Sequence, residues 1–285
     1  MAKITLLPMH QELTLEPGQI YEGVVKIANP IDSQEDLNYE IEVFPFSVIS
    51  DSSFRYEADF AAESDRTMMK DWITLDHYAG ILAPNEVKEL HYKIKVPENA
   101  PSGGQYAAIA VREQKNKVTS EANIQNVIEL MSVLYASVSG ETVHSGEIIE
   151  NRLPGFITSP PAVSTVMVKN TGNVHETVTT NLEVRNALSG QTIFTTFDDA
   201  SHANTDIVMP DAFRSVSRSL TMLGNLGIYD VKVSVDFANN QSTINQRLVV
   251  CPIWFMILVI LTLAAVVGTV IHIVGRHRRA KHFQE

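Results

Sequence analysis

Acidic side chains gather in two stretches of the chain, where their oxygens could bind a cation. One stretch reads FDDASHANTD and carries Asp198, Asp199 and Asp206. The other, residues 32–36, holds three more acidic side chains. Calcium takes about six to eight oxygen ligands, and neither stretch has the residue order of an EF-hand loop. The sequence therefore offers Asp198, Asp199 and Asp206 only as weak calcium candidates, and a solvated acidic loop is the competing interpretation.

Motifs for covalent or metal-assisted catalysis do not occur in the sequence. It contains no HExxH, CxxC, phosphate-binding loop or GxSxG. The histidines outside the C-terminal region are scattered, without a pair on one helix face: His10, His77, His91, His144, His175 and His202. Asp76-His77 and His91 could meet across two strands, but no nucleophile with a base can be nominated. We predict a non-enzymatic protein without catalytic residues or cofactors.

The most distinctive segment is Ile253–Val274, an apolar run of 22 residues without a charged side chain. A helix of about 20 residues, rising ~1.5 Å per residue, crosses a hydrocarbon core of about 30 Å. Trp254 lies at one end, where an amphipathic ring prefers the headgroup level. The basic side chains that follow are Arg276, Arg278, Arg279 and Lys281. We predict a transmembrane helix over residues 251–275, with a buried hairpin of a large domain as the competing interpretation.

The charges that flank this helix predict its orientation. Lys and Arg mark the cytoplasmic side, which makes residues 276–285 a cytoplasmic tail and residues 1–250 extracellular. Residues 1–15 lack the apolar core of a signal peptide, so the start is trimmed, lies upstream, or the protein is a cytosolic one held by its tail. Within the helix, Ala264 and Gly268 form a small-xxx-small pair that would let two helices pack closely, as in a homodimer or a membrane complex.

Composition narrows the choice of partners and of cell compartment. Of the 22 Lys and Arg residues four follow position 275, which leaves 18 cations against 32 acidic residues, a net −14, in residues 1–275. So acidic a region argues against nucleic acid as a partner. Cys251 is the only cysteine, so no intramolecular disulfide forms, which is more typical of a bacterial than of an animal ectodomain. Cys251 is either an acylation site or an inert thiol at the membrane edge.

Short alternating stretches separated by turn residues make up the rest of the chain. Turn signals recur about every ten residues and no long amphipathic helix appears, which predicts β-sandwiches. We expect one sandwich in residues 1–140 and a second in 141–250, linked by Gly140–Pro161. The turn at Met209-Pro210-Asp211 parallels the one at Ala83-Pro84-Asn85. We also expect a helical turn near Ala61–Met69, and a strand over Val127–Val138 that is buried on both faces.

Three segments resemble a known family: LTLEPGQIYEGVVKIANP and ILAPNEVKELHYKIKVPENAPSGGQYAAIAV in the first half, and VMVKNTGNVHETVTTNLEVRN in the second. Over roughly residues 4–280 the chain resembles the bacterial WxL-interacting proteins, and more distantly the pilus-chaperone and fibronectin type III sandwiches. The resemblance implies two immunoglobulin-like domains before the anchor. It also implies peptidoglycan binding by the first domain, and binding of host matrix or surface proteins by the second.

These observations predict a single-pass bacterial surface protein that acts in adhesion or as a scaffold. Membrane lipid would surround residues 253–274, and the partners would be surface proteins or peptidoglycan, bound by sandwich faces, loops or strand edges. The alternative is an accessory or sensor subunit whose helix pairs with a membrane partner. A hydrolase is disfavoured because no catalytic constellation can be assembled.

Overall fold

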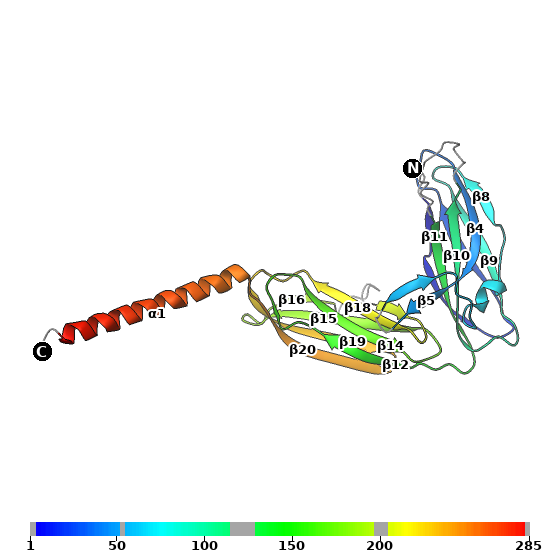
Figure 1. Cartoon of the computed structure of the whole chain (residues 1–285). Coiled ribbons are helices and arrows are strands. Elements are labelled where there is room, and N and C mark those ends of the chain that lie inside the picture. The colour runs from blue at the N-terminus through cyan, green and yellow to red at the C-terminus, as the bar shows by residue number, and fades with distance from the viewer. Residues whose placement is uncertain (1–3, 52–54, 115–128, 197–204, 283–285) are drawn as a thin grey trace.

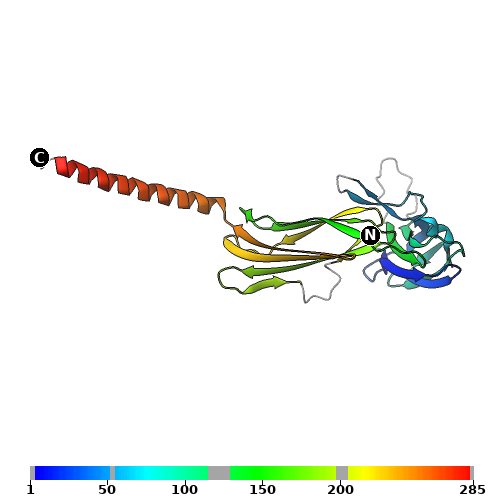
Figure 2. The ribbon, with the colours of Figure 1, turned by 90° about the horizontal axis from the view of Figure 1, so that it is seen from below.

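The protein consists of two consecutive β-sandwiches and one C-terminal helix, α1 (Ile253–His282) (Figure 1). The structure is a computed structural model that describes residues 4–51, 55–114, 129–196 and 205–282, with the side chains of α1 described as far as residue 273. Figure 2 shows that the helix leaves the second sandwich at the end opposite to the first sandwich. The predicted fold class, all-β with two tandem immunoglobulin-like sandwiches and one apolar helix, is confirmed.

The first sandwich packs a four-stranded sheet against a five-stranded sheet. The four-stranded sheet has the order β1 (Thr5–Leu7), β3 (Ile20–Ala28), β9 (Val87–Lys95) and β7 (Ile73–Leu75). The five-stranded sheet has the order β2 (His10–Leu15), β11 (Glu129–Val138), β10 (Gly103–Glu113), β4 (Leu37–Pro45) and β8 (Ala79–Leu82). A separate hairpin, β5 (Ser47–Ser50) and β6 (Tyr56–Asp59), and the short 3₁₀ helix η1 (Met68–Trp72) follow β4.

The second sandwich has the same plan. One sheet has the order β12 (Gly146–Arg152), β14 (Ala162–Asn170) and β18 (Phe213–Leu220). The other has the order β13 (Phe156–Ile157), β20 (Asn240–Val250), β19 (Gly227–Phe237), β15 (Glu176–Asn186) and β16 (Thr192–Thr195), and β17 (Thr205–Val208) also pairs with β15. In both sandwiches the first part of the chain changes sheets, so that β2 pairs in parallel with β11 as β13 does with β20.

Alternation along the strands puts one row of side chains into each core. In β9, for example, Leu90, Tyr92 and Ile94 are buried while the residues between them are exposed. The two main apolar cores are separate, one within each sandwich. Burial of these apolar rows, at about 25 cal/mol per Å² removed from water, is the main source of stability for each sandwich.

Three sequence-based expectations differ from the structure. The predicted linker Gly140–Pro161 contains β12 and β13, because the irregular sequence of β12 includes a bulge between Ile148 and Glu150 that hides its alternation. The strand buried on both faces is β10 rather than β11, which is only half-buried on its second face. The helical turn comes later than expected, at η1.

Each sandwich closes one end with a buried asparagine in the same place. Asn170, at the end of β14, donates from its side chain to the carbonyls of Val174 (2.7 Å) and Val208 (3.0 Å). Asn29, just after β3, donates to the carbonyls of Glu35 (2.9 Å) and Leu82 (3.0 Å). Their backbone N–H groups also have matching acceptors, Ala212 O for Asn170 and Glu86 O for Asn29. The turns with Asn85 and Asp211, which were expected to correspond, both have a positive φ at that residue (65° and 61°).

Candidate functional site

The weak calcium candidates are not brought together by the described part of the chain. Asp198 and Asp199 lie outside the described residues. Asp206 accepts hydrogen bonds from Arg214 (2.7 Å) on one carboxylate oxygen and from Arg218 (2.6 Å) on the other. Among the described residues, no group of three His, Cys, Asp or Glu side chains could hold a metal ion. Asp206 is therefore part of an ion-pair network, which sequence reasoning did not foresee.

The predicted anchor residues lie on a helix that has no fully buried residue between Ile253 and Ile273. Ile253–Ile273 is apolar enough to cross a membrane, and none of it is buried against the sandwiches. Ile253 and Trp254 are exposed, as is Ala264, and Gly268 has open space around it. The remaining anchor residues lie in α1, but their side chains are outside the described set: Val274, Arg276, Arg278, Arg279 and Lys281. The pairing of helices through Ala264 and Gly268 stays a prediction.

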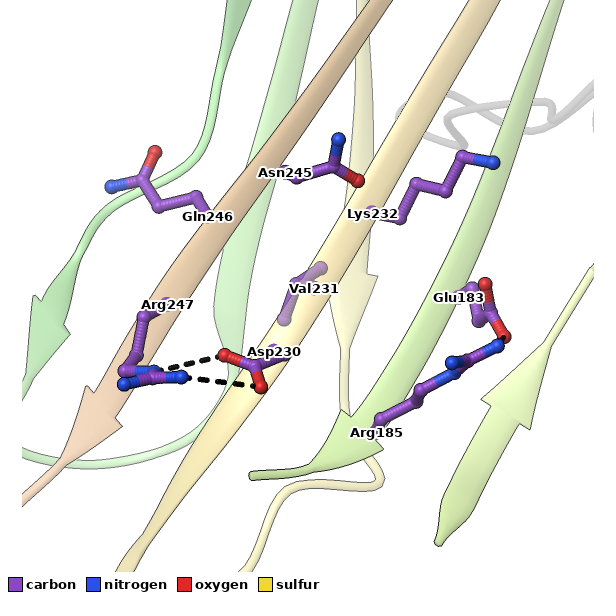
Figure 3. Close-up of a pocket in the computed structure, with 8 residues that line it drawn as sticks. All are labelled: Glu183, Arg185, Asp230, Val231, Lys232, Asn245, Gln246 and Arg247. Atoms are coloured by element: carbon purple, nitrogen blue, oxygen red, sulfur yellow. Dashed lines mark hydrogen bonds and ion pairs between the residues drawn. The ribbon is translucent and has the colours of Figure 1, made fainter. Parts of the chain in front are cut away.

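Among the described residues, each sandwich has a shallow hollow on an outer sheet face. The hollow on the second sandwich, about 660 Å³, lies over β15, β19 and β20 (Figure 3). Its charged side chains pair with each other: Arg247 with Asp230 (2.9 Å) and Arg185 with Glu183 (2.6 Å). Such exposed ion pairs contribute little to stability and form no pairing of nucleophile and base.

The hollow on the first sandwich, about 440 Å³, lies over β3, β7 and β9. Lys93 and Glu22 form an exposed ion pair (2.7 Å), and the Lys93 ammonium lowers the pKa of the Glu22 carboxyl. His91 lies on the same face. The backbone N–H of Asp76 donates to the backbone carbonyl of His91 (3.0 Å). Asp76 and His91 thus meet across two strands, as the sequence allowed, but through a ladder hydrogen bond.

The most elaborate arrangement of side chains is the joint between the two sandwiches. A third apolar cluster fills it, with Phe46, Tyr106 and Ala108 from the first sandwich and Met209 and Ala212 from the second. These five side chains are buried, and partly buried side chains of the β5–β6 hairpin, the loop after it and β11 pack around them. The joint is therefore a small hydrophobic core, which explains why β10 is buried on both faces.

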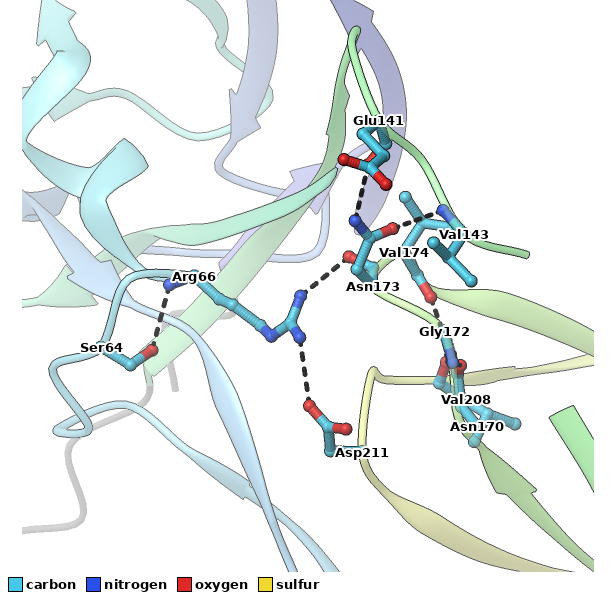
Figure 4. A network of polar contacts seen from close by, with 10 residues as sticks. All are labelled: Ser64, Arg66, Glu141, Val143, Asn170, Gly172, Asn173, Val174, Val208 and Asp211. Atoms are coloured by element: carbon cyan, nitrogen blue, oxygen red, sulfur yellow. Dashed lines mark hydrogen bonds and ion pairs between the residues drawn. The ribbon is translucent and has the colours of Figure 1, made fainter. Parts of the chain in front are cut away.

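Arg66 ties the two sandwiches together with charge-assisted hydrogen bonds (Figure 4). It reaches from the loop before η1 and donates to the carbonyl of Asn173 (2.8 Å) and to the carboxylate of Asp211 (3.1 Å). The same Asn173 carbonyl also accepts from the backbone N–H of Gly104 (2.8 Å). Both acceptors belong to the asparagine-closed end of the second sandwich, so this end is the surface that docks on the first sandwich.

Asn173 also holds the segment that connects the sandwiches. Its side chain accepts from the N–H of Val143 (2.7 Å) and donates to the carbonyl of Glu141 (2.8 Å). Two glycines make this close approach possible. A Cβ on Gly103, whose φ is +101°, would lie 2.8 Å from the Asn173 carbonyl oxygen, and a Cβ on Gly172 would lie 2.1 Å from that of Val143.

The β5–β6 hairpin of the first sandwich adds a second set of contacts. The hydroxyl of Ser50 donates to the carbonyl of Phe213 (3.1 Å) and accepts from its N–H (2.6 Å). Tyr56 donates to the carbonyl of Ile207 (3.1 Å), and the guanidinium of Arg214 lies 4.5 Å from the centre of its ring. The segment after β4 thus folds into a hairpin that binds the second sandwich.

His175 lies in an aromatic setting at the same joint. Its ring lies 5.8 Å from the Tyr106 ring and 5.5 Å from the Tyr135 ring, and its Nδ1 is 3.5 Å from the Tyr106 hydroxyl. Burial lowers the pKa of His175, which favours the neutral imidazole. Burial likewise raises the pKa of Tyr106, and raises that of Tyr135 to about 12. Burial thus favours the neutral forms of these three side chains, which pack against one another in the joint.

Two short segments of the sequence indicate close backbone contacts at this joint, although they were not among the predicted site residues. Gly103-Gly104 precedes Tyr106, a doublet that indicates close approach of another backbone. The segment NTGNVH provides the asparagines and the glycine of a tight connection. Only the fold shows that these segments meet each other, because they lie about 70 residues apart.

Comparisons with known proteins identify similar solved structures but no family. No family model matches the chain, and no curated protein matches it. The class 5 fimbriae chaperone CfaA is 13% identical with a TM-score of 0.38, covering 87% of this chain and 99% of its own. The E. coli chaperone DraB is 12% identical with a TM-score of 0.40, covering 86% and 97%.

The CsuC–CsuE chaperone–tip adhesion subunit complex of Acinetobacter baumannii provides a further match. It is 13% identical with a TM-score of 0.40, and the alignment covers 86% of this chain and 98% of the other. These are structures of the pilus-chaperone class, which was the more distant resemblance in the sequence. The comparisons do not show the resemblance to WxL-interacting proteins. Similarity of this degree assigns neither a function nor a partner to this chain.

Proposed function

We propose that this protein is a non-enzymatic, membrane-anchored surface module that presents two jointed β-sandwiches to external partners. One observation carries the proposal: an exposed apolar helix occurs together with an apolar cluster that packs the two sandwiches against each other. The helix leaves the end of the second sandwich opposite to the joint (Figures 1 and 2). With α1 at one end of the second sandwich and the packed joint at the other, the first sandwich is held away from the membrane.

The helix supports anchoring because Ile253–Ile273 is strongly apolar and none of its residues is fully buried. Its 21-residue segment Ile253–Ile273 would span roughly 32 Å at ~1.5 Å per residue, about the thickness of a hydrocarbon core. Thr262 and Thr269 donate their hydroxyl hydrogens to carbonyls three residues earlier, so the only hydroxyls of this segment are satisfied without water. Exposure of such a helix to water would bring aggregation, so a bilayer is the environment it fits.

The orientation that we propose places residues 1–250 outside the cell and residues 276–285 in the cytoplasm. The four Lys and Arg residues of the tail carry this assignment. We further propose residues 1–140 and 141–250 as the two binding units. Cell-wall material is the proposed ligand of the first, and surface or host proteins are the proposed partners of the second, as the resemblance to WxL-interacting proteins implies.

A sedimentation assay with purified peptidoglycan tests the cell-wall part of this proposal. The full chain in detergent is expected to sediment with the polymer, and Glu22→Ala with Lys93→Ala on the outer face of the first sandwich is expected to reduce the bound fraction. The matched control is Asp230→Ala with Arg247→Ala, which removes an equivalent ion pair from the second sandwich. Equal binding by all three proteins places the ligand elsewhere, and no binding by any refutes the cell-wall proposal.

The exposed face of α1 favours one alternative, an accessory subunit whose helix pairs with a membrane protein. Gly268 has open space around it and Ala264 is one turn away, so a second helix could approach closely there. Co-purification of one membrane protein that is lost with Ala264→Leu and Gly268→Leu would support this alternative. Retention after both changes would assign any such contact to the sandwiches.

A further inference from the structure

The end of the second sandwich from which α1 leaves has an unusual surface. Three loops of the described residues reach this end: 153–161 around β13, 187–191 between β15 and β16, and 221–226 between β18 and β19. The strand register aligns all of them with the last residues of β20. Phe156 and Ile228 pair with Val249, and Asn186 pairs with Tyr229, which in turn pairs with Leu248. Figure 1 shows β16 and the start of α1 at this same end.

These loops carry no charge in a strongly acidic protein. No Lys, Arg, Asp or Glu occurs in residues 153–168, 186–197, 219–229 or 248–275. The opposite end of the same sandwich differs, since Glu141, Glu176, Asp211 and Asp236 lie there. The nearest charged side chains on this sheet, Arg185, Asp230 and Arg247, lie directly beyond the charge-free segments and are held in ion pairs. A lipid surface disfavours ionised side chains, so it fits loops that lack them.

Apolar side chains project from each of the three loops. Leu188 is 83% exposed, Phe156 51% and Leu226 49%. The tip that carries Leu188 is fixed, because Asn186 accepts from the N–H groups of Leu188 (2.9 Å) and Ser189 (3.1 Å). Binding through a leucine on a loop that is already ordered costs little further conformational entropy.

The membrane is close enough to meet these loops. Val250 and Ile253 are three residues apart, which limits their separation to ~10 Å at ~3.3 Å per residue. The headgroup layer adds roughly 5–7 Å to each side of the hydrocarbon core. The junction is also braced, since the N–H of Cys251 donates to the carbonyl of Ile157 (3.0 Å). The loops therefore lie at about the height of the headgroups when α1 spans the bilayer.

We propose that the uncharged end of the second sandwich docks on the lipid surface of the membrane that α1 spans. Leu188, Leu226 and Phe156 insert at the boundary between headgroups and acyl chains, where amphipathic elements bury about 5–10 Å of their apolar side. The inference rests on the proposed anchoring by α1, but it holds for either orientation of the chain. The docked end would make the second sandwich stand in a fixed attitude on the bilayer rather than swing on the helix.

Depth-dependent fluorescence quenching tests this docking in the full chain. Cys251→Ser removes the native thiol, and single cysteines are introduced by Leu188→Cys, Asn239→Cys or Val266→Cys and labelled with a small environment-sensitive fluorophore. The three proteins are reconstituted in phosphatidylcholine vesicles with lipid brominated near the headgroup end of its acyl chains. Position 266 reports on the helix, and position 239 lies on the hairpin at the far end of the sandwich.

Quenching at 188 and 266, but not at 239, is the expected result. Leu226→Asp in the chain labelled at 188 is expected to lower the quenching roughly twofold, because a charge at the interface is costly, whereas Asn240→Asp is not. Quenching at 266 with none at 188 overturns the docking and leaves the anchor intact. Absence of quenching at 266 overturns the anchor and the docking together. Protection of 188 from iodide without quenching by bromine would assign the loops to contact between copies and would also overturn the proposal.

Discussion

The two sandwiches share an asparagine-closed end, but only the second sandwich uses it for docking. Asn170 and Asn29 are both almost completely buried, at 0% and 1% exposure, and bond to corresponding carbonyls. At the second sandwich this end carries the Asn173 carbonyl and Asp211, which bind Arg66. At the first sandwich no described residue of the second sandwich binds the same end, and its loop, residues 29–36, is longer and holds Ile31 in solvent.

Both sandwiches thus share the asparagine-closed end, but the residues that dock it on a neighbour occur only at the second sandwich among the described residues. The Asn170 side-chain oxygen accepts from the N–H of Gly172 (2.8 Å), which completes a tight turn. The corresponding oxygen of Asn29 is buried without a partner among the described residues. In the turn that docks, the side-chain nitrogen and oxygen of Asn170 both have hydrogen-bond partners. In the corresponding turn of the first sandwich, the Asn29 side-chain oxygen has none among the described residues, and burial of such an atom is costly.

Removal of each asparagine gives the largest expected effect and compares the two ends directly. Asn170→Ala loses three buried hydrogen bonds and is expected to lower the free energy of unfolding by roughly 3 kcal/mol. Asn29→Ala loses two and also removes an unpaired oxygen, so about 2 kcal/mol is expected. Urea unfolding measures both values. The same loss from both changes would show that the extra bond of Asn170 has no energetic weight.

Glycine substitutions separate local strain from docking. Gly18→Ala and Gly103→Ala both place an alanine at positive φ (+80° and +101°), which costs about 1–2 kcal/mol. A Cβ at Gly18 has an ordinary neighbour 3.6 Å away, whereas one at Gly103 meets the Asn173 carbonyl oxygen at 2.8 Å. Gly103→Ala should therefore cost more and widen the distance between spin labels on the two sandwiches. An unchanged distance would show that the joint can shift without opening.

Arg66→Ala removes the charged link across the joint and leaves both asparagine ends intact. Its two hydrogen bonds are partly exposed to solvent, so a loss of about 1–2 kcal/mol is expected, together with a broader distance distribution between the sandwiches. Arg55→Ala is the matched control, because Arg55, between β5 and β6, forms exposed ion pairs with Asp51 and Glu57 of its own hairpin. Identical distributions for the two variants would assign the joint to its apolar cluster alone.

Acidification should weaken the docked end through His175, with the smallest effect. Burial lowers the pKa of His175, an effect partly opposed by Glu12 and reinforced by His144. The unfolded chain then binds more protons than the folded one, so stability present above pH ~6.5 is lost as the pH falls toward the lowered folded value. Thermal unfolding from about pH 7.5 to 5.5 should show a smaller decrease for His175→Gln than for the parent. Equal decreases would place the titrating group elsewhere.

Sequence patterns were sufficient for the strands and the helix, but not for the joint. Alternation in β9 and the charge-free run of α1 are local properties, so the sandwich class and the apolar helix could be predicted. The partners of Arg66 could not, because Asn173 and Asp211 are more than 100 residues away in the chain. The partners of Asp206 could not be predicted either. The sequence of an acidic loop is the same whether its carboxylates bind calcium or, as Asp206 does, two arginines.

Protease treatment of intact cells that carry a C-terminal tag on this protein tests the central proposal most directly. If α1 spans the membrane with its basic tail inside, external protease removes residues 1–250 and leaves a short, tagged fragment that contains α1. If the chain instead survives intact until the cells are permeabilised, the sandwiches face the cytosol and the proposal of a surface-exposed binding module is wrong.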